Sequence, residues 1–119
     1  MRHILYFSLL LLCPFLSFAQ ERLQEAETAY SNMQYKRAAT LLTEVADSIE
    51  NAGGTPSADV FYNIGNAYYR QQRFAEATLY YLRALRVHPN FEHATENLRH
   101  AQLHMGFQEI EQGDMFFVR

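Results

Sequence analysis

One fixed spacing of bulky and small residues in the middle of the chain constrains the fold most. From Phe61 to Tyr68, a bulky residue is followed three positions later by an aliphatic one, then directly by a glycine, then by an aromatic residue. Residues three and four positions apart share one face of a helix, so this spacing predicts packed helices joined by a turn. The complete series consists of Phe61, Ile64, Gly65, Tyr68, Ala77, Tyr81, Ala84 and Pro89.

This series resembles the tetratricopeptide repeat (TPR), with Phe61 in the place of its tryptophan and Tyr81 in the place of its phenylalanine. The resemblance implies a helix-turn-helix unit over about residues 58–91. Gly65 and Ala84 are small enough for two helix axes to approach to roughly 8–10 Å. Pro89 is expected to end the second helix because proline has no backbone N–H. Ser57 or Thr55 is expected to cap the first helix.

A weaker copy of the same spacing precedes this unit. Tyr30 and Tyr35 are spaced like Tyr69 and Phe74, and an alanine follows three residues later in both copies. A glycine-containing loop separates the copies, and a single helix that caps the stack is expected after them. We predict a first repeat over about residues 20–52, a loop at 53–57, a second repeat at 58–91 and a capping helix at 92–105, followed by a tail at 106–119 with an apolar end.

The fold class predicted from these elements is all-α: a TPR-type helix-turn-helix solenoid of about two and a half repeats, in a domain over residues 20–105, preceded by a signal peptide. Residues 1–19 combine a basic start, an apolar run and small residues before Gln20, which is typical of a cleaved secretory signal. The apolar run is shorter than the ~20 residues that span a bilayer, although an uncleaved anchor stays open. Export to the periplasm is therefore expected.

Composition excludes several functional classes. Cys13, the single cysteine, lies within the predicted signal, so the mature protein would have no disulfide, thiolate nucleophile or Cys-ligated zinc. A formal net charge of −3 over 119 residues argues against a nucleic-acid partner. Gly53-Gly54 is not followed by Lys-Ser/Thr, which excludes a P-loop, and no nucleophile elbow is present. We expect neither an enzyme nor a cofactor.

Stacked hairpins of this kind place their first helices along one concave face. Amides there can bond an extended peptide backbone, aromatic rings can hold its side chains, and Arg70 can bind a carboxylate. We therefore predict a protein partner, while a solvated polar face without a ligand stays open. The predicted concave residues are Tyr62, Asn63, Asn66, Tyr69 and Arg70 in the second repeat, His93, Glu96, Asn97, His100 and His104 in the capping helix, and Leu23, Gln24, Glu27, Tyr30 and Ser31 in the first repeat.

Three histidines of the capping helix form a further candidate. His93, His100 and His104 lie within about 40° of one another around a helix of 3.6 residues per turn. Histidines four residues apart can chelate zinc, nickel or copper. An exposed polar helix face explains them as well, so no metal is expected, and a metal-sensing module is the least favoured alternative.

A closer resemblance extends beyond the generic repeat. Residues 58–70, 80–85, 97–99 and 113–119 are similar to the BatE-type TPR protein of the bacterial Bat aerotolerance operon. This resemblance implies an exported scaffold, associated with the inner membrane, that works with von Willebrand-type Bat proteins. Gln72 stands where a glycine is common in that family, and Thr78 where an aliphatic residue is usual. The main alternative is a structural protein that self-associates through Phe116 and Phe117.

Overall fold

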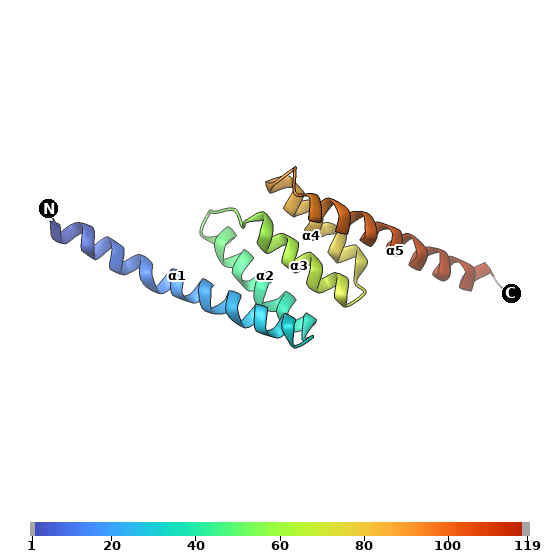
Figure 1. The fold of residues 1–119 in the computed structure, drawn as a ribbon, viewed down its shortest axis with the longest axis horizontal. Coiled ribbons are helices and arrows are strands. Elements are labelled where there is room, and N and C mark those ends of the chain that lie inside the picture. The colour runs from blue at the N-terminus through green and yellow to red at the C-terminus, as the bar shows by residue number, and fades with distance from the viewer. Residues whose placement is uncertain (1, 118–119) are drawn as a thin grey trace.

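A computed structural model of the chain describes the backbone of residues 2–117 and the side chains of residues 17–108. This part of the chain is all-α. Its helices are α1 (Arg2–Ser31), α2 (Tyr35–Asn51), α3 (Ala58–Arg70), α4 (Phe74–Val87) and α5 (Glu92–Phe117). Each helix packs mainly against the next one along the chain. The result is an elongated array of 78 × 30 × 22 Å in which α2, α3 and α4 lie between α1 and α5 (Figure 1).

Two turns with the same backbone geometry join α1 to α2 and α3 to α4. Met33 and Gln72 occupy matching places in them, and both have a left-handed backbone, with φ of 61° and 59°. In each turn the following N–H bonds a carbonyl five residues earlier, from Gln34 to Ala29 at 2.8 Å and from Arg73 to Tyr68 at 3.0 Å. This is the Schellman arrangement, which usually has glycine at the left-handed position. Gln72 therefore adopts a conformation that favours glycine.

The loop between α2 and α3 ends in a side-chain cap. Ser57, one of the two predicted caps, has an extended backbone, and its hydroxyl accepts a hydrogen bond of 3.3 Å from the Val60 N–H. Pro56 beside it is buried, which fixes the chain against the hairpins. At the other end of the repeat, α4 stops at Val87, two residues before Pro89, as the proline predicts.

Small residues dominate the core where the helices cross. Buried alanines lie on all five helices, including Ala26, Ala38, Ala67, Ala84 and Ala101. Their short side chains allow close packing, and a few large residues fill the remaining space, notably Ile64, Phe61 and Tyr81. Of the other residues in the predicted series, Gly65 and Ala77 are buried, Tyr68 is half-buried, and Pro89 is exposed in the turn before α5. Thr78 carries a buried hydroxyl that no residue in the described part of the chain bonds.

The last helix is longer than the sequence indicates. The sequence predicts a capping helix that ends at residue 105 and a tail at 106–119, but α5 continues through both Gly106 and Gly113 to Phe117. The predicted end at residue 105 is therefore wrong. Glycine costs only about 1 kcal/mol relative to alanine inside a helix, and the Gln and Glu residues around it are good helix formers. The side chains of Phe116 and Phe117, the predicted self-association site, lie outside the described residues.

The first helix is also continuous across a predicted boundary. α1 runs from Arg2 through Ala19 and Gln20, between which signal cleavage is predicted. Its N-terminal half projects beyond the other helices (Figure 1). No helix in the described part of the chain is both long enough and apolar enough to cross a membrane. The signal peptide stays a prediction.

Candidate functional site

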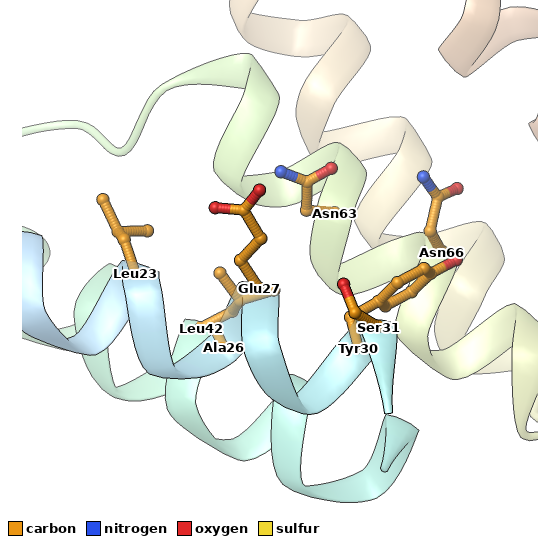
Figure 2. Close-up of a pocket in the computed structure, with 8 residues that line it drawn as sticks. All are labelled: Leu23, Ala26, Glu27, Tyr30, Ser31, Leu42, Asn63 and Asn66. Atoms are coloured by element: carbon orange, nitrogen blue, oxygen red, sulfur yellow. The ribbon is translucent and has the colours of Figure 1, made fainter. Parts of the chain in front are cut away.

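An open groove lies between α1 and α3, with one residue of α2 contributing to its wall. Its volume is about 560 Å³. Figure 2 shows Glu27 of α1 and Asn63 of α3 pointing into the same space from the two helices, with Tyr30 and Ser31 near Asn66. The lining combines aliphatic, aromatic, amide and carboxylate groups, from Leu23, Ala26, Glu27, Tyr30, Ser31, Leu42, Asn63 and Asn66.

Six of the predicted concave residues meet in this groove: four from α1 and two from α3. Gln24 lines a different hollow on α1, together with Glu21 and Glu25, and Glu27 lies on the rim shared by both hollows. Sequence reasoning missed Ala26 and Leu42. Both are buried residues of the helix-packing stripe. Their spacing in the sequence predicts that they pack between helices, and it does not indicate that they also border a groove.

A hydrogen-bond network holds Asn66 in place on α3. Its Oδ1 accepts a bond of 2.6 Å from the Tyr81 hydroxyl and one of 3.0 Å from Asn97 Nδ2. Asn97 also donates to the Tyr62 hydroxyl at 3.2 Å. Burial is the largest cause that raises the pKa of Tyr81, so its hydroxyl stays protonated and can donate. The Asn66 carbonyl is thus occupied on both sides, which fixes the side chain and leaves its two N–H groups for another partner.

Tyr62 and Asn97 therefore act mainly within the protein. The Tyr62 ring packs against Phe91 with centroids 4.8 Å apart and against Tyr81 at 5.9 Å. Its hydroxyl receives the Asn97 bond. These two residues join α3 to α5 and support Asn66, and neither lines the groove between α1 and α3.

Arg70 does not lie in this groove. Its guanidinium donates a hydrogen bond of 2.7 Å to the Tyr35 hydroxyl and lies 5.0 Å from the centre of that ring. The hydrogen bond to Tyr35 raises the pKa of Arg70. Arg70 instead lines a hollow formed with the α1–α2 turn, beside Met33 and Lys36. The predicted role of Arg70 as a carboxylate anchor beside Asn66 is therefore not supported by its position.

The predicted residues of α5 are dispersed. His104 stacks on Phe74 with ring centroids 4.8 Å apart and meets Tyr69 edge-on at 6.0 Å. Glu96 lines a hollow near Pro89 and Asn90, while His93 is exposed and His100 half-buried. Among the described residues, no three His, Cys, Asp or Glu side chains converge as metal ligands. The histidine face and the groove at Asn63 are thus separate surfaces.

The electrostatic character of the groove comes from α1. Glu27 is the one ionised side chain of its lining. The last turn of α1 contains no basic residue, so the negative end of the helix dipole there is not offset by its own side chains. Burial raises the pKa of Tyr30, against an opposing effect of the Arg70 charge, so the Tyr30 hydroxyl stays neutral. The groove therefore presents negative potential together with neutral hydrogen-bonding groups.

The middle hairpin matches a known protein family. Residues 58–91, which contain α3, α4 and the turn between them, match the family model of the tetratricopeptide repeat. These residues form a tetratricopeptide repeat. The match covers the residues over which the spacing of Phe61 to Pro89 predicts one. No curated protein matches the chain. A TPR in a small all-helical protein indicates a protein–protein interaction module.

Proposed function

We propose that this protein is a non-catalytic binding module that holds an extended segment of a partner protein in the groove between α1 and α3. The observation that carries the proposal is the meeting of two amide groups, that of Asn66 held in place by hydrogen bonds, with apolar surface on the face that the first helices of the hairpins share. TPR hairpins are packing units that stack to form such surfaces. The segment would lie across α1 and α3.

The two asparagines are suited to a peptide backbone. Asn63 is exposed, and its side chain bonds no other within residues 17–108, so it can both donate to and accept from a peptide group. Asn66 offers only its N–H groups, because Tyr81 and Asn97 occupy its carbonyl. A pre-oriented donor loses less conformational entropy on binding than a mobile one. Leu23 and Tyr30 supply surface for the side chains of the segment.

A groove-blocking substitution tests this proposal. Peptides that bind the full chain would first be selected from a random displayed library, and their affinity measured by fluorescence anisotropy. Asn63→Trp places a large ring in the groove and is expected to weaken the selected peptides at least about tenfold, a change of about 1.4 kcal/mol. Asn51→Trp makes the same change at an exposed position outside the groove and should leave affinity unchanged.

Two outcomes would overturn the proposal. One is a failure to select any peptide with a chain whose circular dichroism shows the expected helix content. The other is an equal loss of affinity in Asn63→Trp and Asn51→Trp, which would mean that binding occurs elsewhere.

We further propose that this module works outside the cytoplasm, as an envelope scaffold of the Bat type. Support comes from the signal-like residues 1–19 and from the similarity of residues 58–70 to the BatE-type protein. Expressed with its native N-terminus in a Gram-negative host, the protein should be recovered from the periplasmic or inner-membrane fraction. Replacing Leu9 and Leu11 of the apolar run with Asp should keep the protein in the cytoplasm. Cytoplasmic recovery of the unaltered chain would refute export.

A further inference from the structure

We infer that the segment bound in the groove between α1 and α3 presents a lysine or arginine side chain to Glu27. This inference rests on the proposed function and specifies the chemistry of the partner. It is the opposite of the expectation that Arg70 receives a carboxylate, and it follows from the positions of the charged groups around the groove.

The charges near the groove are distributed unequally. Glu27 projects into the space opposite Asn63 (Figure 2), and no cation within residues 17–108 lies at ion-pair distance from it. Arg22 and Arg70 are engaged elsewhere, whereas Arg37 borders the adjacent hollow on α1 with Glu27 and does not line this groove. Arg22 pairs with Glu25 at 3.4 Å and with Glu44 at 3.8 Å, and Arg70 bonds Tyr35. The carboxylate of Glu27 is therefore the charge available to a ligand.

The backbone of α1 adds to the same potential. Glu27 lies one turn before the end of the helix at Ser31, where the helix dipole has its negative end. A carboxylate near this end and the absence of a basic residue in the last turn both favour a cationic ligand. An acidic segment would meet repulsion from Glu27 and from the helix end, so the groove discriminates against it.

The neighbouring side chains also fit a long cationic residue. Leu23 is exposed and offers aliphatic surface along which the methylene stem of lysine or arginine can pack. The neutral ring of Tyr30 lies at the same end of the groove as Ser31. It can take a cation over its face. The charged head would then reach Glu27, with the Asn63 carbonyl as a second acceptor.

A substitution cycle between protein and peptide tests the inference. Among peptides with both ends blocked, selected on the full chain, we expect enrichment of lysine or arginine at one position. Changing that residue to glutamine should weaken binding to the unaltered protein about tenfold, the effect of a charge-assisted bond. In the Glu27→Gln protein, the same peptide change should weaken binding by less than about twofold. Glu50→Gln, at an exposed glutamate of α2 outside the groove, should retain the tenfold effect.

A charge reversal gives an independent result. Peptides with glutamate at the selected position should bind Glu27→Lys more tightly than they bind the unaltered protein. Selected peptides without a basic preference, or an undiminished effect in Glu27→Gln, would overturn this inference and leave the proposed function standing. Failure to select any peptide would instead count against the proposed function itself.

Discussion

Replacing Tyr81 with alanine is expected to lower the free energy of unfolding by about 3–5 kcal/mol, the range for deleting a large buried aromatic side chain. Tyr81 is fully buried at the crossing of α3 and α4. Its ring packs against Tyr62, and its hydroxyl bonds Asn66. Because a small domain has only about 5–15 kcal/mol of stability, a large share would be lost. Urea unfolding followed by circular dichroism measures the change.

Neighbouring variants separate the contributions to this effect. Tyr80→Ala removes the same number of atoms from the preceding residue, which is only half-buried, and should cost clearly less. Tyr81→Phe keeps the ring and removes the bond to Asn66, for a loss of about 1 kcal/mol. Equal losses in Tyr80→Ala and Tyr81→Ala would contradict the packing described for Tyr81.

Gly65→Leu is expected to destabilise the protein by about 3 kcal/mol or more, because it overpacks the crossing of α3 and α4. A Cβ atom at Gly65 would lie 2.6 Å from Cε1 and 2.7 Å from Cδ1 of Tyr81. The Tyr81 ring is enclosed and cannot move aside without displacing Tyr62. Gly65→Ala should show a smaller loss of the same sign. Thermal unfolding of both variants provides the measurement.

Gly106→Ala is the matched control, since a Cβ at Gly106 meets no atom within 4 Å. There the helix propensity of alanine should act alone and stabilise the protein by about 1 kcal/mol. The two Gly-to-Ala variants are therefore expected to have opposite signs. Stabilisation of similar size at Gly65 would show that α3 and α4 do not approach as closely as described.

The middle hairpin could be predicted from sequence because its determinants are local. Phe61, Ile64 and Tyr81 recur at helical spacings, and Pro89 ends α4 whatever the surrounding structure. The length of α5 could not be predicted in this way. Gly106 is compatible with either a helix end or a helix interior. Its neighbours in α5 are good helix formers, so the helix continues through it.

The candidate site was predictable in outline and not in detail. Register alone placed Glu27, Asn63 and Asn66 on first helices, and these residues do border one groove. Arg70 shares that register, but its partner Tyr35 comes from the start of α2, 35 residues earlier in the chain. Helical periodicity gives the face of a residue and says nothing about a hydrogen bond that draws a long side chain away from it. Periodicity likewise does not show that the His104 ring stacks on Phe74.

The packing of each helix mainly against its neighbour in sequence has a consequence for the order in which this molecule comes apart. Loss of α1 and α2 exposes the face of α3 that packs on α2, while the contacts of α3 with α4 and of α4 with α5 remain, so the N-terminal hairpin can open on its own. The groove needs α1 and α3 together, and it therefore exists only while the N-terminal hairpin is docked. A segment bound across α1 and α3 would raise the free energy needed to open the N-terminal hairpin. It would leave the far end of the protein as dynamic as before.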